Sequence, residues 1–306
     1  MSEAITRVTL FVPGTPTSMD GWRDALAGAD CTAEWIANDG HFGEAFGFGT
    51  VAPELVARID RAPGALVLLW PADLRTGRAA IVAAVTRLRD AGALAVRLEE
   101  SKLGWDVDTW LELFGADDPW AWHRGAVAFL RDADALHSIG MHAFALPDVR
   151  IALDGDPAAL QALATSLDLF QLIEDPPLQS GHTFAPDAAT PRRVIERWPA
   201  VEYPPDHPCH NPYGAWHLGP PGGVARSTGA QAFVFVPALR AILAAAEAQA
   251  ETPLTRAEVE AIRDRAACMT MSVADAQRLE RGRGYADLDP ELVWPQWQLV
   301  RGSLPG

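Results

Sequence analysis

Apolar and polar residues alternate along this chain with two different periods, which together predict a mixed α+β protein. Between Pro157 and Leu172 apolar residues recur every three or four positions, and Asp156 is placed to accept backbone N–H bonds as the N-cap. Between Val149 and Leu153 apolar and other residues alternate one by one, which is the period of a strand with one buried face. The two patterns predict a strand, a short loop and a capped amphipathic helix packed as one unit.

The same patterns, applied to the whole chain, predict two rounds of β-α-β-β-α-β, the ferredoxin-like order. A hairpin at Asn38-Asp39-Gly40 and a linking helix at 77–91 complete the first round. Two unrelated α+β lobes are the alternative, because no residue-by-residue repeat accompanies the two rounds. The first round has strands at 5–12, 31–37, 43–48 and 65–70 with helices at 20–26 and from Pro53; the second has strands at 93–98, 124–130, 149–153 and near His182 with helices at 107–114 and 157–172.

The remaining segments predict the domain organisation. Residues 174–223 are rich in proline and glycine, and we expect a long irregular segment with one short helix at Thr190-Pro191. A strand at 232–236 and a helix at 237–250 follow. Capping boxes then start two more helices, and a third is expected at Asp289-Pro290. We therefore expect a main body at 1–250, with halves at about 1–92 and 93–250, and a small helical module at 251–306.

The charge of the chain limits its partners. The 306 residues include 40 acidic and 25 basic ones, for a formal net charge of −15, which disfavours binding to nucleic acids and to anionic membranes. A basic protein partner is compatible with this charge, and so is a role in solubility alone. With 49% hydrophobic residues the chain can bury a large core.

Cysteine content and the N-terminal residues predict a cytoplasmic protein. The three cysteines, Cys31, Cys209 and Cys268, are far apart and odd in number, so they do not indicate a disulfide framework. The first residues lack the basic and apolar regions of a signal peptide. The apolar runs are shorter than the roughly 20 residues of a membrane helix.

Two motifs resemble bacterial families of unknown function. The segment Ser138–Phe144, followed by Pro147-Asp148-Val149, resembles one uncharacterised family, and residues 95–101 with Trp110 are similar to its central segment. The tail, with Arg283-Gly284-Tyr285-Ala286-Asp287-Leu288-Asp289-Pro290-Glu291, resembles a second uncharacterised module. Neither resemblance implies a reaction. The first family has glycine where Ala145 stands, and this departure predicts an unstrained turn.

A group of histidines with one cysteine is the candidate metal site. His207, Cys209, His210 and His217 lie within eleven positions, and imidazole and thiolate are ligands that zinc accepts. Their spacing is not that of a standard zinc finger. The alternative is a proline-stiffened loop whose histidines bond to backbone carbonyls, and we expect this alternative and no cofactor.

Other candidates for binding or acid–base chemistry are His142, His182, Glu99, Glu100 and Trp105. The two histidines lie in turns, and an imidazole can act as an acid or base near neutral pH. Glu99 and Glu100 follow a predicted strand, where α/β enzymes collect acidic groups. The cluster Trp105, Trp110, Trp120 and Trp122 is either core or an interface, and we expect core.

Two hypotheses for function follow from these observations. The first is an accessory or interaction protein without catalytic activity, of the immunity or toxin-neutralising kind, because the chain is acidic and carries no established catalytic motif. The second is a metal-dependent hydrolase in which the loop 207–217 binds zinc and activates water. We expect the first; the sequence leaves the oligomeric state and the substrate or partner open.

Overall fold

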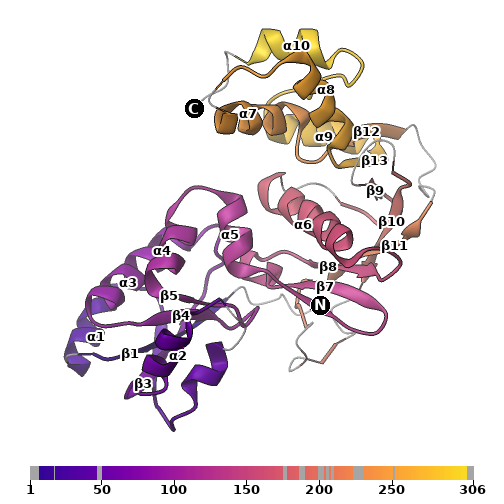
Figure 1. Ribbon diagram of the computed structural model, residues 1–306. Helices are drawn as coiled ribbons and strands as arrows, with labels where there is room; N and C mark the ends of the chain where they lie inside the picture. The colour runs from indigo at the N-terminus through magenta and orange to yellow at the C-terminus, as the bar shows by residue number, and fades with distance from the viewer. Residues whose placement is uncertain are drawn as a thin grey trace. The chain divides into compact units, whose positions relative to one another are not determined.

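The computed structural model has the mixed α+β architecture that the sequence predicts, with two sheets among the described residues (Figure 1). It divides into two compact units: 1–130, 138–148 and 200–214 form the first, and 131–137, 149–199 and 215–306 the second. None of the described helices is long and apolar enough to cross a membrane. The structure describes residues 7–301 except 17, 47–49, 175–177, 186–189, 199–202, 205–206, 208–209, 223–230 and 251.

The first sheet has five strands in the order β2-β3-β1-β4-β5, with antiparallel pairs throughout. Both faces of β1 are buried: Phe11 packs with Phe46 and Ile59, and Leu10 and Val12, which point the other way, are 0% exposed. The elements that form this sheet and the helices around it are β1 (Val8–Gly14), α1 (Met19–Ala25), β2 (Thr32–Ala37), η1 (Phe42–Phe46), α2 (Pro53–Ile59), β3 (Gly64–Trp70), α3 (Arg78–Asp90), β4 (Ala95–Leu98), β5 (Gly104–Asp106), α4 (Val107–Gly115) and α5 (Pro119–Ala126).

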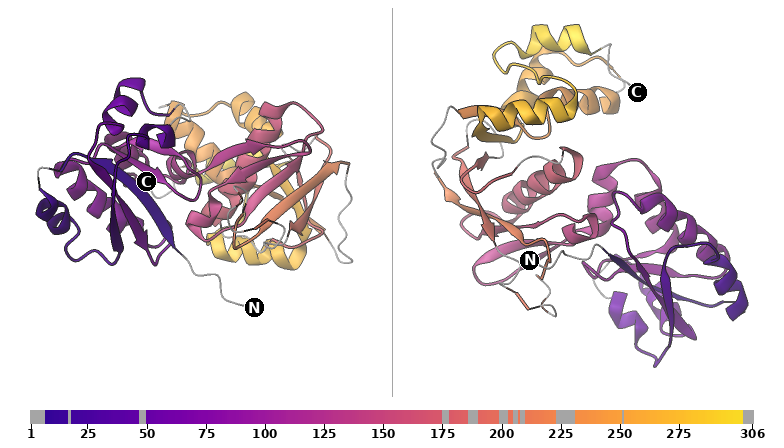
Figure 2. Two further views of the ribbon diagram at one scale, coloured as in Figure 1. Left: turned by 90° about the horizontal axis from the view of Figure 1, so that it is seen from below. Right: turned by 180° about the vertical axis from the view of Figure 1, so that it is seen from behind.

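The second sheet has eight strands in the order β12-β13-β9-β10-β11-β8-β7-β6. Figure 2 shows helices α7 to α10 gathered at one end of it, beside β12 and β13. Its elements are β6 (Ala128–Arg131), β7 (Ala135–Ile139), η2 (Met141–Phe144), β8 (Asp148–Ala152), α6 (Pro157–Glu174), β9 (Thr183–Ala185), β10 (Arg193–Trp198), β11 (Ala215–Pro221), β12 (Gln231–Phe235), α7 (Leu239–Ala250), α8 (Arg256–Arg265), β13 (Cys268–Ser272), α9 (Val273–Arg283) and α10 (Val293–Val300).

Several expected elements are wrong, and all of them involve strands. Residues 42–46 form the 3-10 helix η1 instead of a strand, with Gly43 held by the Asp60 carboxylate, which accepts its N–H at 2.6 Å. Asn38 does not turn a hairpin; its amide donates to three carbonyls, those of Ile59, Asp60 and Ala62. The helix α5 extends to Ala126, so the strand expected at 124–130 begins later, as β6 at Ala128–Arg131.

The second half and the tail also differ from the expected organisation. Strand β4, expected in the second half, pairs with β1 in the first sheet, so a boundary near residue 92 does not separate the sheets. The helix expected at Thr190 is replaced by β10, and the supposedly irregular segment 174–223 contains β9, β10 and β11. The tail is not purely helical, because β13 pairs with β12 on one side and β9 on the other.

The core beside β12 and β13 unites the tail with the rest of the second unit. Trp297 of α10 is 0% exposed and shares this core with Phe235 of β12 and Ala185 of β9. Leu243, Val259 and Cys268, from α7, α8 and β13, are also part of it. The tail therefore closes an apolar core that begins outside it.

Candidate functional site

The Gly140–Asp148 motif is a structural clamp in the first unit. Gly140 has φ +120°, and a Cβ there would lie 2.1 Å from the Ala126 carbonyl oxygen, so only glycine fits. Asp148, which is buried, accepts the Met141 N–H at 2.9 Å and the Asn211 side-chain N–H at 2.9 Å. The Gly140–Asp148 motif thus has a structural role that accounts for its glycine and its aspartate.

Ala145 follows η2 in a left-handed conformation, with φ 58° and ψ 34°, so the expectation of an unstrained turn is wrong. A side chain in this region costs about 1–2 kcal/mol, while glycine adopts it freely. We expect Ala145→Gly to raise the free energy of unfolding by about 0.5–1 kcal/mol after the entropy of the unfolded glycine is counted. Urea denaturation of both proteins measures the difference, and a loss of stability would contradict the strain.

His142 lies in η2 with its Nδ1 atom buried and without a hydrogen-bond partner. Burial, and then the positive charges of His210, Arg7 and Lys102, lower the pKa of His142 to about 4. The imidazole is therefore neutral at physiological pH. A base with so low a pKa is poorly matched to proton transfer near neutrality, so the environment of His142 does not favour catalysis.

Glu99 and Glu100 lie in adjacent positions but in different environments. Glu99 is paired with Arg97 Nε at 2.7 Å and with Lys102 Nζ at 2.7 Å. Glu100 accepts the Thr9 N–H at 2.8 Å through Oε1, while its Oε2 is buried without a partner. Burial raises the pKa of Glu100 from 4.5 to about 7, against the opposing hydrogen bonds. Glu99 thus belongs to a half-buried group of ion pairs, and Glu100 is a carboxyl that titrates near neutral pH.

Glu100 should make stability depend on pH. The pKa of Glu100 is higher in the folded state than in the unfolded state, so ionisation of Glu100 lowers the free energy of unfolding. This loss is absent below about pH 4.5, grows as the pH rises, and is complete above about pH 7. We expect Glu100→Gln to be more stable than the natural protein by about 1–2 kcal/mol at pH 8 and equal to it at pH 4. Urea denaturation at both pH values measures this, and a difference that does not change with pH would contradict it.

His182 lies in the second unit, beside the start of α9. Its Nε2 is 3.5 Å from an Asp275 carboxylate oxygen, and its Nδ1 accepts the Gln179 N–H at 3.4 Å. The same carboxylate accepts the Ser272 hydroxyl at 2.7 Å, and Ser272 in turn caps α9. Burial lowers the pKa of His182, and Asp275 opposes this. Asp275 thus contacts both Ser272 and His182, and the imidazole does not contact the hydroxyl. The histidine is therefore not placed to take a proton from the serine.

The histidines of the metal hypothesis make other contacts. His207 stacks on Tyr203 with ring centroids 4.5 Å apart, and His210 Nδ1 is 2.9 Å from the Tyr203 carbonyl oxygen. His217 Nδ1 faces Arg150 Nη1 at 3.0 Å, which leaves its Nε2 for a metal. Burial and then Arg150 lower the pKa of His217. Cys209 lies outside the described residues, among which no group of three or more His, Cys, Asp and Glu could hold a metal.

The tryptophan cluster of the first unit divides into packed and exposed members. Trp110 is 0% exposed, Trp122 is buried, and Trp105 donates through Nε1 to the Gly125 carbonyl at 3.0 Å. Trp120 is different, because 54% of it is exposed. Exposed tryptophans of this kind are frequent anchors of protein interfaces.

Trp120 lies beside a run of acidic residues, and we call this surface the acidic corner. Residues 106–118 contain five acidic residues and no basic one. Asp108 and Glu112 share one face of α4 at a spacing of four, and Asp117 and Asp118 lead into α5. All four are exposed. Two of them are ion-paired, Asp117 with Arg78 Nη2 at 3.0 Å and Asp108 with Arg89 Nη1 at 3.6 Å. The corner therefore presents a large apolar side chain in a segment rich in carboxylates, two of which already have a basic partner within the chain.

Side-chain hydrogen bonds from Arg78 and Trp122 fix the backbone at the acidic corner. Arg78 Nη1 donates to the Phe114 carbonyl at 2.8 Å and to the Ala116 carbonyl at 3.1 Å. The Arg78 guanidinium also stacks over the Trp122 ring at 4.1 Å, and Trp122 Nε1 donates to the same Ala116 carbonyl at 2.7 Å. These bonds position Trp120 before any partner arrives, which lowers the entropic cost of binding.

The motif that starts at Arg283 forms a second structural centre, in the second unit. Arg283 donates to the Glu174 carboxylate and, at 3.0 Å, to the Phe235 carbonyl oxygen. Gly284 ends α9 with φ 76°, and Asp287 accepts the N–H groups of Leu239 and Arg240 at the start of α7. This motif therefore joins α9 to α6, α7 and β12.

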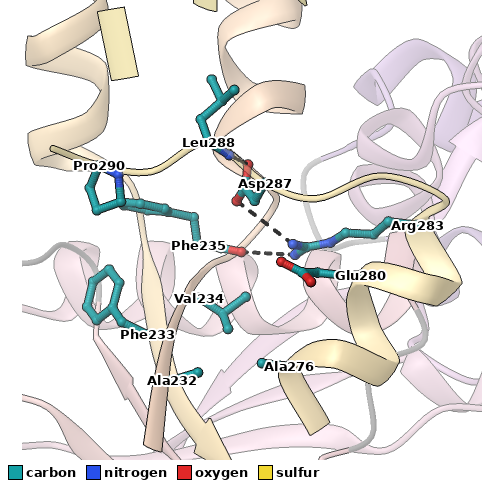
Figure 3. A pocket seen from close by; sticks show the side chains of 10 residues that line it. All are labelled: Ala232, Phe233, Val234, Phe235, Ala276, Glu280, Arg283, Asp287, Leu288 and Pro290. Atoms are coloured by element: carbon teal, nitrogen blue, oxygen red, sulfur yellow. Dashed lines mark hydrogen bonds and ion pairs between the residues drawn. The ribbon is translucent and has the colours of Figure 1, made fainter. Parts of the chain in front are cut away.

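A cavity of about 110 Å³ lies beside this centre, against β12 (Figure 3). Most of its lining is apolar, and Arg283, Asp287 and Glu280 supply the polar groups. Sequence reasoning missed this cavity and the exposure of Trp120, since both depend on which surfaces the folded chain leaves uncovered. The lining residues are Ala232, Phe233, Val234, Phe235, Ala276, Glu280, Arg283, Asp287, Leu288 and Pro290.

Comparison with known proteins assigns no family to the chain. No protein-family model, curated protein or solved structure matches it significantly. The function therefore has to be inferred from the geometry alone.

Proposed function

We propose that this protein is a cytoplasmic interaction protein, without catalytic activity, that binds a basic protein partner through the acidic corner. The observation that carries the proposal is the 54% exposure of Trp120 beside the acidic run 106–118. Tryptophan supplies much of the energy of an interface, and surrounding carboxylates steer and orient a basic partner. An accessory protein of the immunity or toxin-neutralising kind has these properties.

The distribution of charge supports a partner for the first unit. This unit holds 21 of the 40 acidic residues but only 11 of the 25 basic ones. This excess of acidic residues gives the first unit a negative field that favours the approach of a basic partner.

A photo-cross-linking amino acid at position 120 tests the proposal in cells that express the gene natively. We expect a discrete adduct with one basic protein, because the side chain at this position reaches the partner first. Leu299, which is 81% exposed in the second unit, is the matched control position. Equal adducts from positions 120 and 299, or none from position 120, would overturn the proposal.

Charge reversal separates the acidic corner from the overall charge. Glu112→Lys should reduce the adduct about tenfold, which corresponds to about 1.4 kcal/mol of binding free energy. Glu34→Lys changes the charge of the same unit equally, at an exposed residue outside the corner, and should leave the adduct nearly unchanged. Equal losses in the two variants would show that net charge, and not this surface, is responsible.

The hydrolase hypothesis remains a prediction, because no contact of the described residues favours it over the interaction protein. For the fold of the first unit we propose a ferredoxin-like core, offset from the residues that the sequence pattern indicated. Strands β1 to β4 with helices α1 and α3 follow the order β-α-β-β-α-β when η1 and α2 are counted as an insertion between β2 and β3. The strand order β2-β3-β1-β4 supports this interpretation.

A further inference from the structure

Among the residues that the structure describes, strand β12 is the edge of the eight-stranded sheet, and its own sequence lacks the usual protection of an edge. Natural edges carry charged residues, prolines or bulges that prevent pairing with another chain. Gln231–Phe235 contains no charged residue and no proline, and its register with β13 is continuous. Phe233, in its middle, is 37% exposed.

The pairing of β12 with β13 shows which backbone groups face the open edge. The Val236 N–H donates to the Ala267 carbonyl at 2.9 Å, so Val236 faces β13. Because backbone groups alternate along an antiparallel strand, those of Phe233 and Phe235 point away from β13. The Phe235 carbonyl accepts Arg283 Nη2 in agreement with this direction. Phe233 therefore presents one N–H and one C=O for pairing with another strand.

The cavity beside β12 has room for one side chain, and Arg283 supplies a hydrogen-bond donor in its lining. Its volume is about 110 Å³, enough for a branched aliphatic side chain, since a cavity of about 150 Å³ holds benzene. The side chain of Arg283 is 3% exposed, and its Nη1 is buried without a hydrogen-bond partner, 3.8 Å from the nearest Asp287 oxygen. Figure 3 shows Arg283 reaching toward Asp287 and the Phe235 carbonyl at the end of β12.

The charges around the cavity define the ligand further. Arg283 pairs with the Glu174 carboxylate and lies 3.8 Å from an Asp287 oxygen, so its charge is already balanced and a neutral carbonyl is the suitable acceptor for Nη1. A second guanidinium, that of Arg192, lies over the Phe233 ring, 5.1 Å from its centroid. Glu280 is exposed at the rim of the cavity. Its carboxylate can pair with a lysine or arginine of a ligand.

We propose that the edge of β12 and the adjoining cavity bind an extended segment of a partner protein. The segment adds a strand through Phe233, places one aliphatic side chain in the cavity, and pairs a neighbouring lysine or arginine with Glu280. Main-chain pairing of this kind gives affinity, and pockets for alternate side chains give specificity. The site lies in the second unit and shares no residue with the acidic corner, so it goes beyond the proposed function.

Binding of a labelled peptide to the full chain tests the proposal by fluorescence anisotropy. The probe is fluorescein-labelled Ser-Lys-Thr-Leu-Thr-Lys amide. We expect saturable binding that weakens about tenfold or more when glycine replaces the leucine, since burial of this side chain supplies most of the affinity. Probes with a single N-methyl group on a backbone amide next to the leucine keep all side chains and remove one backbone N–H donor. At the position that pairs with Phe233, this change should also weaken binding about tenfold or more. No binding, or equal binding of all these probes, would overturn the proposal.

Variants of the protein identify the site. Ala276→Leu fills the cavity from α9 and should weaken the leucine probe about tenfold, with an unchanged melting temperature as the check on folding. Glu280→Gln should weaken it about threefold at low salt. Glu291→Gln, an exposed acid outside the lining, is the matched control and should have no effect. Loss of binding in the control but not in Ala276→Leu would place the peptide elsewhere.

Sedimentation of the unlabelled protein distinguishes a partner from a second copy. We expect a monomer at the concentrations of the peptide assay. A dimer that the leucine probe dissociates, and that Ala276→Leu does not form, would show that β12 pairs with itself and would overturn the proposed occupant.

Discussion

Truncation of the chain after Ala250 is expected to abolish cooperative folding of the second unit. Strand β13 lies between β12 and β9, so its removal leaves both without their common partner. The cut also removes Val259, Cys268 and Trp297 from the core that Phe235 shares. Truncation of a single large core side chain costs about 2–5 kcal/mol, and a whole domain is stable by only about 5–15 kcal/mol. The sequence indicated a small helical module at 251–306, whereas β13 ties this segment to the sheet of the second unit.

Thermal unfolding followed by circular dichroism, with limited proteolysis, measures this effect. Trp297→Ala, a milder change than the truncation, should lower the free energy of unfolding by about 3–5 kcal/mol. Leu299→Ala is the matched control on the same helix; it is 81% exposed and should change stability by less than about 0.5 kcal/mol. A cooperative transition in the fragment 1–250 that includes the second sheet would contradict the role assigned to β13.

The second large effect is expected from Glu174→Ala. The side chains of Glu174 and Arg283 are 5% and 3% exposed, and Glu174 also accepts the Ala238 N–H at 2.9 Å. Loss of the carboxylate leaves a buried guanidinium without its partner, which costs about 3–5 kcal/mol. Burial raises the pKa of Glu174 even though Arg283 opposes it, so the pair carries a large desolvation cost. We therefore expect Glu174→Met with Arg283→Met to recover most of the lost stability.

Urea denaturation of Glu174→Met, Arg283→Met and the double variant gives the coupling energy of this pair. Arg256 and Glu260 form an exposed pair in α8, with 69% and 36% of their side chains accessible, and provide the control. Glu260→Ala should cost less than about 1 kcal/mol. If Glu174→Ala were as mild as Glu260→Ala, the Arg283 motif would not be the structural centre described above.

Helices with local signals were predictable from sequence. Asp156 caps α6 through the Ala159 N–H, and Thr255 with Glu258 forms the capping box of α8. Pro53 opens α2, and Gly92 follows α3 with φ 103°. Each of these signals acts over three or four residues, so the chain segment itself contains the information.

Strands were less predictable, because their partners are remote in sequence. Cys268–Ser272 is a short apolar run between two capped helices, and it becomes β13 only through pairing with residues 231–235 and 183–185. Residues 43–48 were expected to form a strand, yet 42–46 form η1, where the Asp60 carboxylate accepts the Gly43 N–H. Short strands depend on cross-strand packing more than on their own propensity.

The candidate sites divide in the same way. The sequence by itself determined the acidic run 106–118, the two motifs at Gly140 and Arg283, and the mixed α+β class. Only the tertiary structure decided that Trp120 remains exposed while Trp110 is buried, and that Glu174 meets Arg283, 109 positions away. The reason is physical: charge and capping are properties of neighbouring residues, whereas exposure and buried pairing depend on which distant segments pack together, and that packing is decided by the whole core.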